Sequence, residues 1–119
     1  MDDEPDGRAL IKRFLEDCKA VVSVAGTAAE ALEMICAERP DVLISDIGMP
    51  EVDGYELMRR VRALGSRNGG GTPSIALTAY ARSEDRMKAI MAGFQHHVAK
   101  PVEPAELITM VASLCKRVT

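Results

Sequence analysis

The chain is poor in aromatic residues and has no basic cluster. Among its 119 residues there is no tryptophan, and there are only two tyrosines and two phenylalanines. The formal net charge is −3 at pH 7, and the basic residues are scattered. A nucleic-acid-binding module needs a basic stripe to neutralise phosphates, so the charge argues against that class. The one short basic stretch, Arg59, Arg60 and Arg62, is typical of a solvated helix face.

Cysteine is also scarce. Cys18, Cys36 and Cys115 are an odd number and lie far apart, each within an amphipathic helical pattern. This supports neither a disulfide framework nor a zinc site, and it predicts small, buried or half-buried side chains in a reducing compartment. The N-terminus lacks the basic and apolar regions of a signal peptide, and no apolar run is long enough to cross a bilayer. We therefore expect a cytoplasmic chain without membrane contact.

Apolar spacing divides the chain into alternating helices and strands. Helical spacing predicts helices over 8–19, 27–38, 53–65, 83–93 and from 104 onwards. β-branched or continuous apolar runs predict strands over 20–25, 42–46, 74–78 and 96–99. Capping boxes open helices at Thr27 and Asp53. The glycine-rich residues 65–72 predict a flexible connector.

Within the helix predicted over 83–93, one apolar stripe stands out. Met87, Ile90 and Met91 recur at helical spacing. Such a stripe normally faces the core. We therefore expect these three side chains on the inner face of the helix.

Strict alternation predicts an α/β fold with a doubly wound parallel sheet and helices on both faces. The unbroken apolar run over 42–45 agrees, because strands of such a sheet are buried on both faces. The length fits a single domain, residues 1–119. The alternation begins on a helix, so the first strand is expected to be largely missing, with Met1, Asp2 and Asp3 as its end.

Polar residues stand at the ends of these strands. Asp46, Thr78 and Lys100 end three of them, and Asp2 and Asp3 belong to the remnant of the first. In an open parallel sheet, ligands and chemistry collect at the carboxyl ends of the strands. We therefore expect two or three carboxylates, one hydroxyl and one ammonium to meet in one site.

Taken in order, these residues resemble a known family, the response-regulator receiver domains. The resemblance covers essentially the whole chain and is carried by Asp2-Asp3-Glu4-Pro5, Asp46-Ile47-Gly48-Met49-Pro50 with Asp53-Gly54, Thr78-Ala79 and Lys100-Pro101. It implies a flavodoxin-like receiver fold of five parallel strands, truncated here at the first. The sequence around Asp46, Thr78 and Gly93 most resembles that of receivers at the carboxyl end of hybrid sensor histidine kinases.

The resemblance implies two-component phosphorelay signalling. Asp46 would accept a phosphoryl group from the phosphohistidine of a histidine kinase or a phosphotransfer domain. Lys100 would pair with Asp46 and then with the phosphoryl group, to which Thr78 and the Ala79 N–H would donate. Mg²⁺ would be the cofactor, held by Asp2, Asp3, Asp46 and the backbone carbonyl of Gly48. A cis Lys100-Pro101 bond is also implied.

The family further implies a switch, in which the counterpart of Thr78 moves towards the phosphate and an aromatic residue turns inward. His97 stands at the aromatic position, where the family more often has tyrosine or phenylalanine. We expect either that His97 rotates as well, or that it is a half-exposed strand histidine. The face expected to contact partners comprises residues 83–91 and 103–116.

Two other functions stay open. An aspartyl-nucleophile phosphohydrolase would turn over external substrates, but haloacid-dehalogenase enzymes resemble Asp-x-Asp, and Gly48 stands at the second position here. A pseudo-receiver would bind proteins without being phosphorylated. The chain is not expected to be a classical enzyme. Because the first strand is central in this fold, its absence would expose two strand edges, and we expect a partner chain, a strand rearrangement or a homodimer to cover them.

Overall fold

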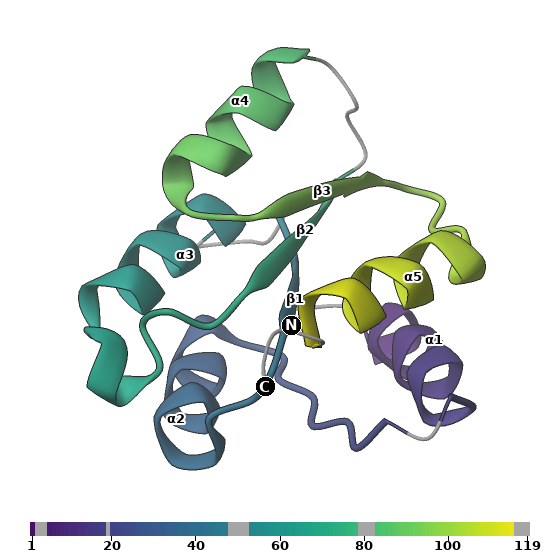
Figure 1. Ribbon diagram of the computed structural model, residues 1–119, viewed down its shortest axis with the longest axis horizontal. Coiled ribbons are helices and arrows are strands. Elements are labelled where there is room, and N and C mark those ends of the chain that lie inside the picture. Colours follow the sequence, from purple (N-terminus) through teal and green to yellow (C-terminus); the bar gives the residue numbers. More distant parts are fainter. Residues whose placement is uncertain (2–4, 19, 48–52, 79–82, 116–119) are drawn as a thin grey trace.

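The chain folds into a parallel sheet covered by helices. The computed structural model describes residues 1, 5–18, 20–47, 53–78 and 83–115. Its elements are α1 (Pro5–Glu16), α2 (Ala28–Glu38), β1 (Leu43–Asp46), α3 (Gly54–Ala63), the 3₁₀ turn η1 (Ser66–Asn68), β2 (Ser74–Thr78), α4 (Ser83–Ala92), β3 (His96–Ala99) and α5 (Pro104–Cys115). Within these residues the strands are parallel in the order β1-β2-β3, with helices on both sides (Figure 1). The doubly wound α/β prediction is confirmed.

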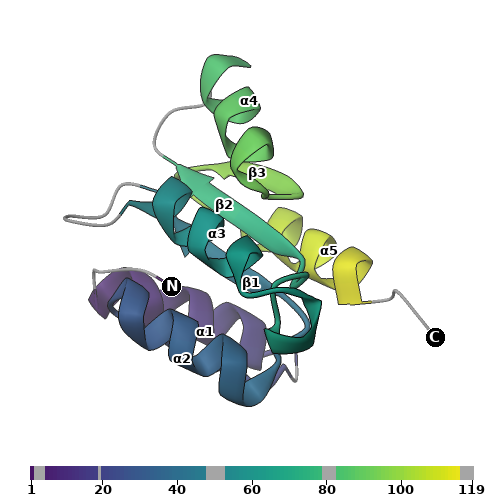
Figure 2. The ribbon, with the colours of Figure 1, turned by 90° about the vertical axis from the view of Figure 1, so that its left-hand side faces the viewer.

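Two apolar clusters hold the layers together. Figure 2 shows α3 in front of the sheet and α5 behind it. The cluster on the α3 side joins α2, α3 and α4 to the sheet and includes Ile35, Leu57, Met58, Val61, Ala76 and Phe94. The cluster on the α5 side includes Ile75, Leu77, Val98 and Leu107, with Ile11 of α1 packed against it. Successive residues of β2 therefore point to opposite, buried faces, as a central parallel strand requires.

The predicted helix starts are confirmed in atomic detail. The Thr27 hydroxyl accepts a hydrogen bond from the Glu30 N–H at 3.2 Å, and a carboxylate oxygen of Asp53 accepts from the Glu56 N–H at 2.9 Å. Each satisfies a backbone donor that the first turn of a helix leaves without a partner. Gly93, with φ of 121°, ends α4 in a conformation that favours glycine.

The strand predicted over 20–25 is wrong. This segment is irregular, and the Val21 side chain is fully exposed. Its composition favours a strand, but a strand also needs a neighbour with which to exchange backbone hydrogen bonds. Within the described part of the chain, no backbone ladder joins residues 21–25 to β1.

The predicted inner face of α4 is also wrong. Met87, Ile90 and Met91 are 61%, 51% and 80% exposed. The helix packs instead through Ala89, which is fully buried. A small side chain allows α4 to approach α3 closely, and the larger residues are left on the outside.

Two cysteines differ from expectation in the same way. Cys18 and Cys36 are exposed thiols rather than buried or half-buried side chains. The third, Cys115, ends α5, and its side chain lies outside the described part. No helix in the described ranges is long and apolar enough to cross a membrane.

Candidate functional site

Three polar residues lie at the carboxyl edge of the sheet. Asp46 is the last residue of β1, Thr78 is the last of β2, and Lys100 directly follows β3. The parallel register places Asp46 beside Leu77 and Thr78 beside Ala99. The Lys100 N–H donates to the Thr78 carbonyl at 2.7 Å, which extends the ladder to the site. The structure therefore brings the Asp46 and Lys100 side chains into contact and places Thr78 at the same edge of the sheet.

The centre of the site is an ion pair. The Lys100 ammonium nitrogen lies 3.0 Å from Oδ2 of Asp46, with the Asp46 side chain only 7% exposed and that of Lys100 37% exposed. The Lys100-Pro101 peptide bond is cis, as the sequence resemblance implied. A charge pair that is partly shielded from water interacts more strongly than one in bulk solvent. The Lys100 ammonium therefore offsets the negative charge of a carboxylate that is almost buried.

The backbone of Asp46 is fixed on several sides. Its N–H donates to the Met1 carbonyl at 2.9 Å, and its carbonyl accepts a hydrogen bond from the Ser45 hydroxyl at 3.0 Å. On the other side, α3 begins against the strand end, where the Gly54 N–H donates to the Ile47 carbonyl at 2.9 Å. A Cβ at position 54 would lie 2.6 Å from the Asp46 carbonyl oxygen. Glycine is thus required for this close approach.

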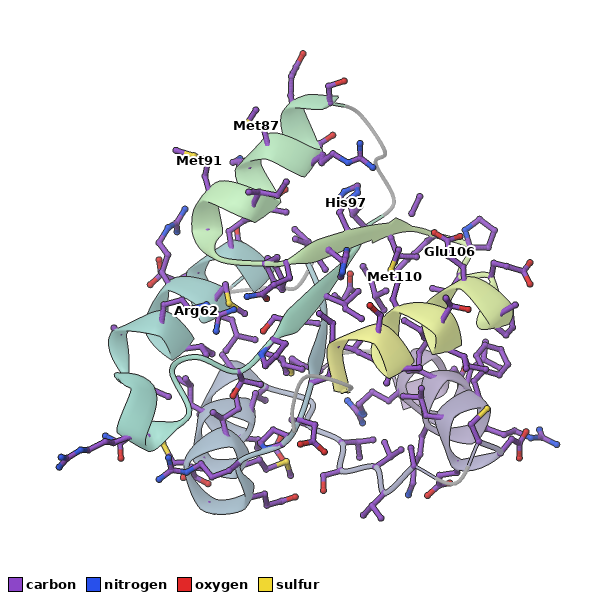
Figure 3. The ribbon with its side chains drawn as sticks, viewed as in Figure 1. Arg62, Met87, Met91, His97, Glu106 and Met110 are labelled. Atoms are coloured by element: carbon purple, nitrogen blue, oxygen red, sulfur yellow. The ribbon has the colours of Figure 1, made fainter. Side chains whose placement is uncertain are left out.

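Thr78 and His97 lie on neighbouring strands near this edge. Thr78 is buried, at 4% exposure. His97 pairs with Ala76 in the β2–β3 register, and its ring lies on the side of β3 that faces α4 (Figure 3). Its Nε2 is buried and has no hydrogen-bond partner among the described residues. A buried polar nitrogen without a partner is unfavourable, so this nitrogen is a point of low stability among the described residues.

The other predicted site residues lie outside the described ranges. These are Asp2, Asp3, Gly48 and Ala79. In the ranges that the structure does describe, no three His, Cys, Asp or Glu residues form a group that could hold a metal ion. The predicted metal ligands and the predicted Ala79 donor therefore stay predictions.

Sequence reasoning missed the role of Arg62. Arg59 and Arg60 do form the expected solvated face, each paired with Glu56. Arg62 instead donates to the carbonyls of three residues, Gly70, Thr72 and Gly93. Burial lowers the pKa of its guanidinium. The connector predicted over 65–72 thus contains η1. Arg62 holds it by hydrogen bonds to two of its carbonyls.

The sequence comparison identifies the family. The chain matches the model of the response regulator receiver domain over residues 1–112, and it belongs to that family. It is 50% identical over 115 residues to an uncharacterised 14.6 kDa protein of Leptolyngbya boryana, covering 97% of this chain and 86% of that protein. It is 35% identical over 118 residues to response regulator Rre1 of Synechocystis sp., covering 98% of this chain but only 50% of that protein.

A solved structure supports the same conclusion about the fold. The signal receiver domain of a signal transduction histidine kinase from Syntrophus aciditrophicus superimposes with a TM-score of 0.85 at 28% identity, covering 100% of this chain and 91% of that one. The chain therefore has the flavodoxin-like fold of this family of signalling domains. Within the described ranges its sheet has three strands, one fewer than the four predicted, because residues 20–25 do not form a strand.

Proposed function

We propose that the chain accepts a phosphoryl group on Asp46 from the phosphohistidine of a histidine kinase or a phosphotransfer domain. The observation that carries this proposal is the 3.0 Å contact between the Lys100 ammonium and Oδ2 of a nearly buried Asp46. Family membership supports it, because the chain matches the receiver domain of response regulators over residues 1–112. Asp46 stands at the point where a parallel sheet presents its ligands.

In the transfer, an Asp46 carboxylate oxygen forms a bond to phosphorus while the bond from phosphorus to the donor imidazole nitrogen breaks. The electron pair of the broken bond stays on that nitrogen. Lys100 would pair first with the carboxylate, which it already contacts, and then with a phosphoryl oxygen. Thr78, at the end of the adjacent strand, would donate its hydroxyl to the phosphoryl group, and the Ala79 N–H would do the same. Such donors stabilise charge that develops in the transition state.

Mg²⁺ would be the cofactor at these strand ends, because it prefers oxygen ligands. Its direct carboxylate ligands would be Asp46 and Asp3. Asp2 would bind it directly or through a water molecule, and the backbone carbonyl of Gly48 would be the remaining protein ligand. Support comes from Met1, which precedes the two acids and is hydrogen-bonded to the Asp46 backbone. When bound, such a hard cation supplies positive charge next to phosphate oxygens. An anionic carboxylate approaching an anionic donor needs that charge.

The output would be a change at the face formed by α4, β3 and α5. Figure 3 shows Met87 and Met91 pointing away from the sheet on α4, His97 on the α4 side of β3, and Glu106 on α5. Exposed methionine side chains adapt to varied partner surfaces. Thr78 and His97 would be the switch residues, since a phosphoryl group can shift the equilibrium only through contacts that differ between two states. The buried Nε2 of His97 has no partner among the described residues in the present state, which favours a second position.

The test is phosphorylation of the whole chain with Mg²⁺ and acetyl phosphate, followed by intact-mass measurement. We expect one added phosphoryl group, and none in Asp46→Asn. Asp17→Asn, at an exposed position, is the matched control and should be phosphorylated like the parent. Failure of the parent with both acetyl phosphate and a phosphorylated histidine kinase would indicate a pseudo-receiver. Repeated turnover of many phosphoesters would indicate a phosphohydrolase instead.

The switch has its own measurement. The ring NMR signals of His97 are expected to shift when the parent is phosphorylated, and those of His96 to shift less. Adjacent strand residues point to opposite faces, so His96 reports general effects on β3. Unchanged His97 signals at full phosphorylation would remove His97 from the switch and leave Thr78 alone.

A further inference from the structure

The outer face of α4 carries two methionines that take no part in the core. Met87 and Met91 are 61% and 80% exposed, and Figure 3 shows both pointing away from the sheet. They are four positions apart, so they lie on the same side of the helix. Ile90, which is 51% exposed, is their neighbour on this surface. We call these three side chains the α4 stripe, and solvent reaches all of them.

The other methionines that the structure describes are more shielded. Met58 of α3 is fully buried. The rest are half-buried and pack against the two apolar clusters, namely Met1, Met34 and Met110. A small molecule dissolved in water therefore meets the methionines of the stripe first.

The packing of α4 does not depend on the stripe. Ala89 is the residue through which the helix is buried. The turn that follows α4 is held by Arg62, whose Nη2 donates to the Gly93 carbonyl. A polar atom added to the stripe would therefore stand in water, and the core would keep its contacts.

Methionine differs from the other apolar residues in its chemistry. Its polarisable thioether can be oxidised to a sulfoxide, which makes the side chain polar and is reversed by sulfoxide reductases. With hydrogen peroxide, the sulfur lone pair attacks one peroxide oxygen. The S–O bond forms as the O–O bond breaks, and the second oxygen leaves as water with both peroxide protons. The sulfur loses two electrons, and the peroxide gains them.

We propose that Met87 and Met91 are an oxidation site, at which a peroxide converts the α4 stripe from apolar to polar without changing the fold. The site itself does not depend on phosphorylation of Asp46. Its effect on output rests on the proposed function, because the stripe lies on the face expected to contact partners. An apolar contact there loses its hydrophobic contribution when the thioethers become sulfoxides. Oxidation therefore opposes output in either state of Asp46.

The first experiment treats the folded full chain with dilute hydrogen peroxide and measures oxidation of each methionine by digestion and mass spectrometry. We expect Met87 and Met91 to react at least about tenfold faster than Met58, because a buried side chain reacts only when the structure opens locally. Met34 and Met110 should lie in between. In concentrated urea the rates should come together. Equal rates for Met58 and the pair in the folded chain overturn the proposal.

The second experiment measures the surface by hydrophobic-interaction chromatography of the folded chain. The oxidised parent should be retained less than the untreated parent, and sulfoxide reductases for both epimers should restore its retention. The double variant Met87→Leu/Met91→Leu conserves volume and should keep its retention after peroxide treatment. Met110→Leu is the matched control, because it removes a half-buried methionine and should lose retention like the parent.

Unchanged retention of the oxidised parent overturns the proposal, and so does an equal loss in the double variant. A fall in the urea midpoint on oxidation of the parent, but not of the double variant, would mean that the pair is packed in solution and is not a surface site.

Phosphorylation is measured separately, with acetyl phosphate and Mg²⁺, on the oxidised and the untreated parent. Equal phosphorylation supports a modification confined to the output face. A loss that the double variant does not show counts against it. A chain that is oxidised selectively at the pair but is never phosphorylated contradicts the proposed function and supports the oxidation site.

Discussion

Arg62 provides the sharpest test of how the fold is held together. Its Nη1 donates to the carbonyls of Gly70 and Thr72 at 2.8 and 2.7 Å, and its Nη2 donates to the Gly93 carbonyl at 2.6 Å. One side chain therefore joins the segment that enters β2 to the turn between α4 and β3. We expect Arg62→Ala to destabilise the chain far more than other arginine substitutions on α3.

The expected loss is about 3 kcal/mol. A hydrogen bond from a charged donor contributes about 1.5–3 kcal/mol. Because Arg62 is only half-buried, water replaces part of each contact, and we take about 1 kcal/mol for each of the three carbonyls. That is a large fraction of the roughly 5–15 kcal/mol that stabilises a typical domain. Arg62→Lys should recover little, because one ammonium cannot match the spread of a planar guanidinium.

Urea unfolding at equilibrium is the measurement. The midpoint should fall while the slope stays constant, which indicates lost stability in an unchanged transition. Arg60→Ala is the control, because Arg60 makes only an exposed pair with Glu56 at 3.3 Å. Its loss should be about 0.3–0.5 kcal/mol. If the two variants differ by less than about 0.5 kcal/mol, the role assigned to Arg62 is wrong.

Two further predictions concern Tyr55 and the apolar side chains. Burial, followed by the charges of Asp85 and Asp53, raises the pKa of Tyr55 above 10.0. The folded chain then keeps this proton longer than the unfolded one, so its contribution to stability is full below about pH 10 and is lost as pH rises further. Urea unfolding at about pH 8 and about pH 11 should show a smaller decrease for Tyr55→Phe than for the parent, and equal decreases would contradict the shift. Leu57→Ala, at a fully buried position, should lower the free energy of unfolding by about 2–5 kcal/mol. Met91→Ala should change it by less than about 0.5 kcal/mol, and similar losses in both would mean that α4 packs through its methionines.

The parts of the fold that depend on neighbours in sequence could be predicted. β2 and β3 have the predicted bounds, and Thr27 and Asp53 cap their helices as expected. Capping depends on residues three positions apart, and a buried strand shows itself as an apolar run. Local chemistry is sufficient for both.

The failures share a different cause. Residues 20–25 have the composition of a strand but no ladder partner in the described ranges. In α4, Ala89 rather than the methionine stripe faces α3, because packing distance favours the small side chain. Arg62 binds carbonyls that are 8 to 31 positions away. Each outcome is decided by distant segments, which hydrophobic periodicity does not report.

The site was predictable in part for a topological reason. Parallel strands bring their carboxyl ends to one edge, so Asp46, Thr78 and Lys100 could be grouped before their geometry was known. The Lys100–Asp46 contact and the cis Lys100-Pro101 bond were implied by the family resemblance, and both are present. The close approach of Gly54 to the Asp46 carbonyl was not foreseen, because it depends on where α3 begins against β1.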